Sequence, residues 1–252
     1  MHPAPAVPHE AGCYVISLRP AGAHAALRRA AARHGLRVFA LSPWRIARRD
    51  DAHAREALDM ALAAEVVVFT SPPAVAAAAA LRALRAAPGQ TWLGVGAGTA
   101  RALRRAGVGD ADAPSRMDSE GLLALPALAD VAGRSIGLVT APGGRGVLAS
   151  TLHDAGAELR RADVYLRVPT PPSPARIDRL MALPTPWLLP LSSGEALQRT
   201  LDRLPAPAVH RLRQAHVLAA SARLATLARC AGFTCITQAA DATPASLLAA
   251  AR

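Results

Sequence analysis

The chain is poor in aromatic residues, contains no lysine and has only three cysteines. Aromatic side chains make up 3% of its 252 residues. All 29 basic residues are arginines, which excludes Schiff-base chemistry and a P-loop lysine. Only Cys230 and Cys235 are close in sequence, and their spacing fits neither a CxxC metal site nor an even disulfide framework. We expect all three cysteines to be buried as small hydrophobic residues.

Long apolar runs and clustered histidines are also missing. Glu65, Pro72 and Pro73 interrupt the most apolar segment, Val66–Leu81, so no stretch of about 18 apolar residues could cross a membrane. The first twelve residues lack the apolar core of a secretory signal. The eight histidines are scattered, with no pair at the spacing of two ligands on one helix face. We therefore expect a soluble cytoplasmic protein that has no metal site and does not bind membranes.

Alanine and arginine dominate what is present. The chain has 61 alanines and a formal net charge of +11, and its length allows one large domain or two small ones. The charge is compatible with nucleic acid, an anionic membrane surface or an acidic small molecule as partner. Nucleic acid is disfavoured, because eight aromatic residues offer few stacking partners and the arginines form no single stripe.

Short β-branched or apolar runs alternate with alanine- and leucine-rich helical stretches. Strict alternation of strand and helix predicts an α/β protein with largely parallel sheets. The predicted strands are Tyr14–Leu18, Val66–Thr70, Trp92–Val95, Ile136–Thr140, Trp187–Leu191 and Val217–Ala219.

The same landmarks occur twice in the chain. Pro142 follows Pro20 by 122 residues, and Ser193 follows Ser71 by the same interval. Further along, Ala106-Gly107 recurs as Ala231-Gly232, and Leu122-Leu123 recurs as Leu247-Leu248, both at an offset of 125. We infer two copies of one α/β unit of roughly 120 residues, with a cleft between them. Chance similarity between alanine-rich helices is the alternative.

Two extended stretches interrupt the alternation at equivalent places in the two copies. Leu36–Ile46 and Glu158–Val168 are interpreted as paired connectors between the domains. The proline-rich segment Pro169–Pro174 follows the second stretch and is typical of a stiff linker.

Loops that follow parallel strands open at one edge of the sheet, where ligands bind. Here these loops are rich in glycine, serine and threonine, so they would present backbone N–H groups and hydroxyls to an oxyanion. Arg19, Arg145 and Arg223 lie in or beside them and can bind carboxylate or phosphate. The hydroxyl residues Ser71, Thr99, Ser192 and Ser193 have an alternative interpretation as plain helix caps.

Catalytic motifs are sparse, and Tyr165 is the main candidate. It is one of two tyrosines and lies in the second connector, where a phenol facing the cleft would be a proton donor. Packing of an amphipathic side chain in the connector is the alternative.

The order of these motifs resembles the uroporphyrinogen-III synthase family from Val15 to Leu248. The matching segments are Ser17–Pro20, Val67–Val75, Val95–Ala100, Asp118–Leu123, Gly143–Arg145, Asp163–Tyr165, Leu191–Gly194 and Ser221–Arg223. The resemblance implies two flavodoxin-like α/β domains joined by a two-stranded connector, with the first strand and helix of each copy built into the other domain. The implied bounds are 1–38 with 168–252 for one domain, 45–158 for the other, and 39–44 and 159–167 for the connector strands.

The resemblance also implies the chemistry. Such an enzyme, a hydro-lyase of tetrapyrrole biosynthesis, cyclises hydroxymethylbilane, a linear tetrapyrrole with eight carboxylates, to uroporphyrinogen III with loss of water and inversion of ring D. It is expected to act as a monomer without a cofactor. Tyr165 is implied as the catalytic proton donor. The implied substrate-binding residues are Arg19, Ser71, Thr99, Ser119, Gly144, Arg145, Ser192, Ser193, Gly194, Ser221 and Arg223.

The sequence departs from the family pattern in its cleft loops, for example at Leu18, where a threonine is common, and at Ala219–Ser221. A weakened or non-catalytic protein of this type that binds an anionic small molecule is therefore the alternative function.

Overall fold

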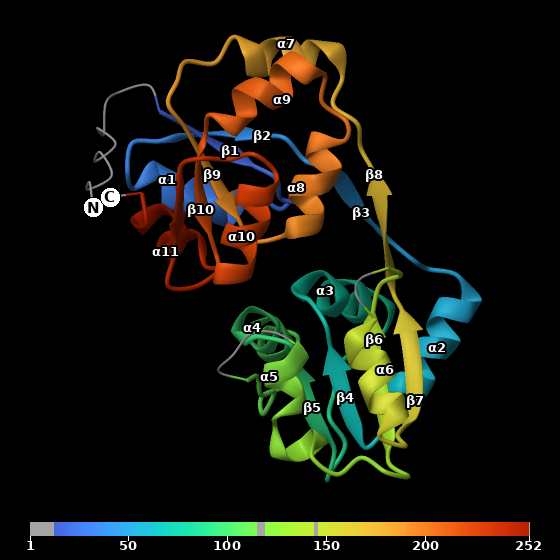
Figure 1. Cartoon of the computed structure of the whole chain (residues 1–252). Helices are drawn as coiled ribbons and strands as arrows, with labels where there is room; N and C mark the ends of the chain where they lie inside the picture. Colours follow the sequence, from blue (N-terminus) through green and yellow to red (C-terminus); the bar gives the residue numbers. More distant parts are fainter. Residues whose placement is uncertain (1–12, 115–118, 144–145, 252) are drawn as a thin grey trace. The chain divides into compact units, whose positions relative to one another are not determined.

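The computed structural model describes residues 13–114, 119–143 and 146–251, with the side chains of Ser119 and Glu120 left out. The chain divides into two compact units. Unit 1 comprises Met1–Arg45 and Val168–Arg252, and unit 2 comprises Ile46–Arg167. Each unit contains a parallel sheet with helices packed on it (Figure 1). The α/β class and the two parallel sheets predicted from the sequence are confirmed.

Unit 1 is built on a five-stranded parallel sheet in the order β11-β10-β9-β1-β2. Its strands are β1 (Tyr14–Ser17), β2 (Arg37–Ala40), β9 (Trp187–Leu191), β10 (His216–Ala219) and β11 (Ile236–Gln238). Its helices are α1 (Ala25–Ala32), α7 (Pro174–Met181), α8 (Gly194–Leu201), α9 (Ala206–Arg213), α10 (Ala222–Cys230) and α11 (Pro244–Ala249). Apolar residues of α1 and α11 form a buried cluster with Val15, Leu188 and Leu218 of the sheet.

Unit 2 is built on a four-stranded parallel sheet in the order β5-β4-β6-β7. Its strands are β4 (Val66–Phe69), β5 (Thr91–Gly94), β6 (Ser135–Thr140) and β7 (Glu158–Asp163). Its helices are α2 (Ala52–Leu62), α3 (Pro72–Leu81), α4 (Ala97–Arg105), α5 (Ser119–Leu123), the short 3₁₀ helix Pro126–Leu128 and α6 (Val147–Asp154).

Strand β4 shows why a continuous apolar run forms a central strand. All four of its residues are buried, and alternate residues face opposite sides of the sheet. Val67 and Phe69 join a cluster with α2, α3 and α4, whereas Val66 and Val68 join a second cluster with α5 and α6. Helix α2 packs so closely on β6 that a Cβ at Gly137 would lie 1.9 Å from the Ala61 carbonyl oxygen.

The two sheets are equivalent strand by strand. At an offset of 122, β1 corresponds to β6 and β4 corresponds to β9. At an offset of 125, β5 corresponds to β10, and Asp112, which forms an isolated parallel bridge with Leu93, corresponds to a residue of β11. The neighbour order is therefore the same in both units, although β1 and β9 of one sheet come from different copies in the sequence.

Each extended stretch predicted as a single connector contains two strands. The first holds β2, which joins the sheet of unit 1, and then enters β3 (Trp44–Arg48). The second holds β7, which joins the sheet of unit 2, and then enters β8 (Tyr165–Pro169). Strands β3 and β8 form the two-stranded sheet, and the division between the units falls within them. The first part of each stretch pairs with a neighbouring parallel strand, so β3 and β8 share only residue 44 and residues 165–167 with the expected connector bounds 39–44 and 159–167.

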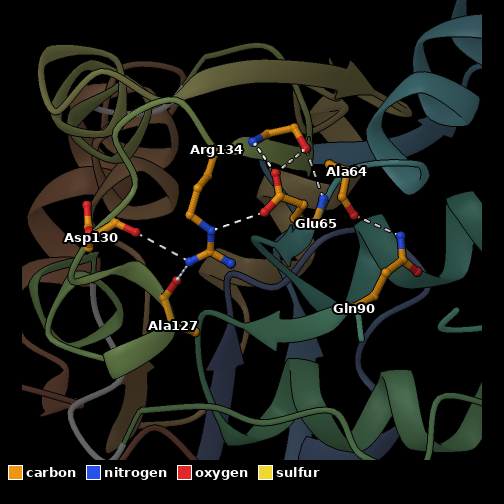
Figure 2. A network of polar contacts seen from close by, with 7 residues as sticks. Ala64, Glu65, Gln90, Ala127, Asp130 and Arg134 are labelled. Carbon is orange, nitrogen blue, oxygen red and sulfur yellow. Dashed lines mark hydrogen bonds and ion pairs between the residues drawn. The ribbon is translucent and has the colours of Figure 1, made fainter. Parts of the chain in front are cut away.

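A polar network ties together the amino ends of β4 and β6 (Figure 2). The Glu65 carboxylate accepts hydrogen bonds from the Ser135 backbone N–H at 3.2 Å and from Arg134 Nε at 3.2 Å. The Ser135 amide and the Arg134 guanidinium hold the pKa of Glu65 below its ordinary value. The polar groups at this edge of the sheet are therefore hydrogen-bonded to one another. The carboxyl ends of the strands lie at the opposite edge.

The prediction that all cysteines are buried is wrong for two of them. Cys13 is buried, whereas Cys230 at the end of α10 and Cys235 after it are exposed. Cys230 is the last residue of α10 and lies with Arg229 on the exposed side of the last turn, whereas Ala228 of the same turn is buried.

Candidate functional site

Ser71 and Tyr165 come together in unit 2 although they are 94 residues apart. The Ser71 hydroxyl lies 3.1 Å from the Tyr165 hydroxyl, and either oxygen can be the donor. Ser71 is also the N-cap of α3, where its Oγ accepts a hydrogen bond from the Ala74 N–H at 3.2 Å. The cap holds Ser71 Oγ at a helix N-terminus, so the phenol of Tyr165 is directed at a position that favours negative charge.

Tyr165 is almost completely buried. Its side chain is 2% exposed and belongs to the apolar cluster that includes Phe69, Ala74 and Val164. Ser71 is half-buried. Packing therefore fixes the ring, and the Tyr165 hydroxyl contacts the less buried Ser71 hydroxyl. Both roles considered for Tyr165 in the sequence, packing and presentation of a polar hydroxyl, are compatible with this geometry.

A cavity of about 230 Å³ opens at the carboxyl ends of β4 and β6 in unit 2. At its polar side, the Thr70 hydroxyl donates a hydrogen bond to the Thr140 hydroxyl at 2.8 Å. Arg161 and Arg167 also line it, and Arg161 is held by Asp163 Oδ1 at 3.0 Å and by the Ala141 carbonyl oxygen at 3.3 Å. The remaining lining consists of Gly143, Gly146 and the apolar residues Val95, Leu138, Val147, Leu148 and Ala149.

Helix α6 begins at this cavity. Its N-cap Gly146 has φ +67°, a left-handed conformation that favours glycine. The first backbone N–H groups of α6 have no partner within the helix and can bind an oxyanion. The cavity therefore combines hydroxyls, a helix N-terminus and two guanidinium groups, which together suit a carboxylate.

Some residues predicted for this side of the protein have other placements. Thr99 is buried inside α4 and does not cap it, because Gly96 occupies the N-cap position. Strand β5 ends so close to α4 that a Cβ at Gly94 would lie 2.9 Å from Thr99 Cβ. Ser119 begins α5, and its side chain is outside the description. Gly144 and Arg145 lie outside the described residues.

The residues predicted in unit 1 follow β1, β9 and β10. Ser193 caps α8 and Ser221 caps α10, accepting from the N–H groups of Ala196 at 3.2 Å and Leu224 at 3.4 Å. Ser192 precedes the cap and is exposed, and it is therefore not the cap itself. The other three residues predicted there are Arg19 directly after β1, the exposed Arg223 in α10, and Gly194, where a Cβ would lie 2.7 Å from Leu227 Cδ1.

A larger cavity in unit 1, of about 470 Å³, was missed by the sequence reasoning. It is lined by Ala21, Gly22, His24, Ala40, Leu41, Ser42, Thr170, Pro171, Pro172, Ser173 and Arg176. His24 is 4% exposed and bridges two hydroxyls, with Nδ1 2.8 Å from Ser17 Oγ and Nε2 2.9 Å from Ser42 Oγ. No local pattern predicts this chain of contacts, because the partners come from β1, α1 and the loop after β2. The only available signal was the proline-rich segment, which contributes two prolines to the wall.

The described ranges contain no group of three or more His, Cys, Asp or Glu side chains placed to hold a metal ion. Within them, no helix is long and apolar enough to cross a membrane.

Two equivalent parallel α/β units, with hydroxyls, arginines and helix N-termini at the carboxyl ends of their strands, define a two-unit α/β protein that is suited to binding oxyanions. The family model of uroporphyrinogen-III synthase HemD matches residues 25–249, and the chain belongs to this family.

Solved structures of uroporphyrinogen III synthases share the fold. A mutant enzyme from the extremely thermophilic bacterium Thermus thermophilus matches with a TM-score of 0.62 and 18% identity, over 95% of this chain and 96% of that chain. The enzyme from Helicobacter pylori matches with a TM-score of 0.59 and 12% identity, over 95% of this chain and 97% of that chain.

Proposed function

We propose that the protein is a uroporphyrinogen-III synthase, a hydro-lyase that cyclises hydroxymethylbilane to uroporphyrinogen III in tetrapyrrole biosynthesis. Membership of the family carries this proposal. The clustering of hydroxyls and arginines at the ends of parallel strands supports it, because the substrate of this reaction bears eight carboxylates. The net charge of +11 attracts such an anionic ligand as it approaches the protein.

Carboxylate groups of the substrate would bind at loops that follow the parallel strands. In unit 2 the cavity with Thr70, Thr140 and Arg167 is suited to one side chain of the tetrapyrrole. The residues named from the family resemblance are retained as substrate-binding proposals, except that Thr99 is buried and would act by supporting the first turn of α4. They are Arg19, Ser71, Ser119, Gly144, Arg145, Ser192, Ser193, Gly194, Ser221 and Arg223.

The reaction would begin with loss of water from the hydroxymethyl group. Tyr165 would supply a proton through Ser71 to the hydroxyl group, the C–O bond would break, and water would depart. Tyr165 would then be a phenolate, and the tetrapyrrole would be an electrophilic protonated azafulvene. The terminal pyrrole would then attack through its substituted carbon to form a spiro intermediate. This intermediate would fragment and reclose in the inverted sense, and the proton lost from the final pyrrole would restore the Tyr165 phenol.

The protein would control which carbon attacks. Spontaneous closure gives the uninverted isomer, so the bound chain must be folded to favour attack at the crowded position. No electrons are exchanged and only water is lost, so the balanced reaction needs no cofactor. We further propose that the protein acts as a cytoplasmic monomer.

The alternative is a related protein that binds an anionic small molecule without chemistry. The burial of Tyr165 is compatible with this function, because the phenol then serves to pack unit 2 and to hold the cap of α3. The product formed from enzymatically generated hydroxymethylbilane distinguishes the two functions. Formation of the type III isomer supports the synthase. An isomer ratio equal to that of the spontaneous reaction contradicts it.

A further inference from the structure

The 470 Å³ cavity of unit 1 contains hydrogen-bond donors and no carboxylate in its wall. Its volume is within the range of small-molecule sites. All its lining residues belong to unit 1, and they come from the loops after β1 and β2, the segment after β8 and the first turn of α7. It shares no lining residue with the threonine and arginine site of unit 2.

Arg176 is held in a fixed position at this cavity. Its Nε donates to the Ala40 carbonyl oxygen at 3.0 Å, and its Nη2 donates to the same oxygen. Its guanidinium carbon lies 4.2 Å from the centre of the Phe39 ring. Among the described residues Nη1 has no hydrogen-bond partner, so one edge of a pre-positioned guanidinium can bind a ligand.

The hydrogen bonds of His24 determine whether the Ser42 hydroxyl can donate to a ligand. Ser17 is 1% exposed, and within the described chain its hydroxyl contacts only His24. If His24 Nδ1 carried the proton, the buried Ser17 hydrogen would have no acceptor, which is costly. We therefore assign the proton to Nε2, so that Ser17 donates to Nδ1 and Nε2 donates to Ser42. The Ser42 hydrogen then points away from His24 and is available to a ligand.

The charge around the cavity is positive and uncompensated. Burial, together with the charges of Arg28, Arg19 and Arg176, lowers the pKa of His24. The pKa of Arg176 is lowered by burial and by the charges of Arg179 and Arg28. None of these arginines has an ion pair among the described residues, whose ion pairs involve other arginines. A bound anion would relieve this repulsion.

We propose that this cavity binds one carboxylate-bearing side chain of the tetrapyrrole, with Arg176 Nη1 and the Ser42 hydroxyl as donors. The cavity is large enough for a short carboxylate arm and part of its pyrrole ring. The identity of the ligand as the tetrapyrrole rests on the proposed function. The chemical class of the ligand, a carboxylate, does not. A free small carboxylate shares that chemistry, so the experiment separates the two sources.

The first measurement follows the His24 Cε1–H resonance by NMR while sodium propionate is added to the wild-type protein, with sodium chloride at equal ionic strength as control. Assignment comes from His24→Gln. A saturable shift with propionate and none with chloride is expected, because a carboxylate beside His24 favours its protonated form. A response that is identical for the two salts overturns the carboxylate site.

The second measurement compares steady-state kinetics with hydroxymethylbilane. Arg176→Gln should raise KM about tenfold, the effect expected for a charged hydrogen bond, with kcat changed less than about twofold. Ser42→Ala removes only a hydroxyl and should raise KM by a smaller factor in the same direction. Arg213→Gln is the matched control, since Arg213 Nε also donates to a carbonyl oxygen in unit 1, that of Ala231 at 2.8 Å, but does not line the cavity.

The outcomes distinguish the two proposals. A propionate shift with unchanged KM in both cavity variants overturns assignment to the substrate and leaves a site for a free carboxylate. A wild-type protein that does not favour the type III isomer contradicts the proposed function, while the propionate titration still decides whether the cavity binds carboxylates. Thermal unfolding of each variant verifies that a change in KM does not reflect loss of the fold.

Discussion

Tyr165 is the residue on which the proposed chemistry depends most. Tyr165→Phe removes the hydroxyl that contacts Ser71 and retains the buried ring. We expect kcat to fall by about one to three orders of magnitude, because a positioned proton donor would be lost. The free energy of unfolding should fall by only about 1 kcal/mol, the net contribution of one hydrogen bond. Measurement of kcat alongside urea unfolding separates the two effects.

The chain offers one matched control for this substitution. Tyr14, the other tyrosine, accepts a long hydrogen bond of 3.5 Å from Arg37 at the surface of unit 1. Tyr14→Phe should leave kcat unchanged. Equal rates for wild type and Tyr165→Phe would remove Tyr165 from the mechanism and favour its packing role.

His24 should make stability depend on pH. Burial and the charges of Arg28, Arg19 and Arg176 hold its folded pKa below the ordinary value of about 6.5. The unfolded chain therefore binds more protons in this range, and the free energy of unfolding falls as the pH drops through about 6.5. The loss ends below the folded pKa, where His24 is protonated in both states.

Urea unfolding at pH values between about 8 and about 5 measures this dependence, since the range spans the ordinary histidine pKa. His24→Gln should show a smaller loss of stability toward acid than wild type. Part of the loss should persist in the variant, because burial also lowers the pKa of His216. The interpretation fails if both proteins lose stability equally over this range.

At the scale of elements, Ser71 links a helix cap to the candidate site. Ser71→Ala removes the acceptor for the Ala74 N–H and the partner of Tyr165. Thr243→Ala removes the corresponding acceptor for the Ser246 N–H at the start of α11 in unit 1. Both variants should lose about 1 kcal/mol of stability. Only Ser71→Ala should also lower kcat. Equal rates for the two variants would mean that Ser71 only caps α3 and takes no part in the reaction.

The sequence predicted elements well where a pattern is local. The apolar run at Val66–Phe69 predicts β4, and the serine that precedes Pro72 predicts the start of α3 because it can cap the helix. Strands β2 and β7 were not separated from β3 and β8, because residue patterns do not show where a chain leaves one sheet for another. Strand β11 is short and only half-buried, so it carries little apolar signal.

The candidate site was predictable only in part for the same reason. Helix caps such as Ser71, Ser193 and Ser221 are local features and are found where small polar residues follow a strand. Contacts such as Ser71 with Tyr165, or Ser17 with His24 and Ser42, depend on which strands become neighbours. Thr70 and Thr140 were within reach of sequence reasoning, because Thr140 is the last residue of β6 and Thr70 directly follows β4.

At the scale of the whole molecule, one duplicated sequence produces two sheets with the same strand order. The exchange of β1 and β6 between copies is invisible to a search for repeats, since an offset shows which segments are equivalent but not which segments pair. The excess of arginine also has a structural meaning at this scale. Part of it forms surface ion pairs, whereas Arg176 lines the 470 Å³ cavity without an ion pair among the described residues, and the charges of Arg19, Arg28 and Arg179 act on the pKa of His24 or of Arg176.

The proposed function requires that this chain direct ring closure toward the inverted isomer. Freshly generated hydroxymethylbilane can be supplied to increasing concentrations of the protein, and the fractions of type I and type III uroporphyrinogen measured. We expect the type III fraction to rise with protein concentration until it is nearly the sole product, and Tyr165→Phe to need much more protein to reach the same fraction. A fraction equal to that of spontaneous closure at every concentration would contradict the proposed function.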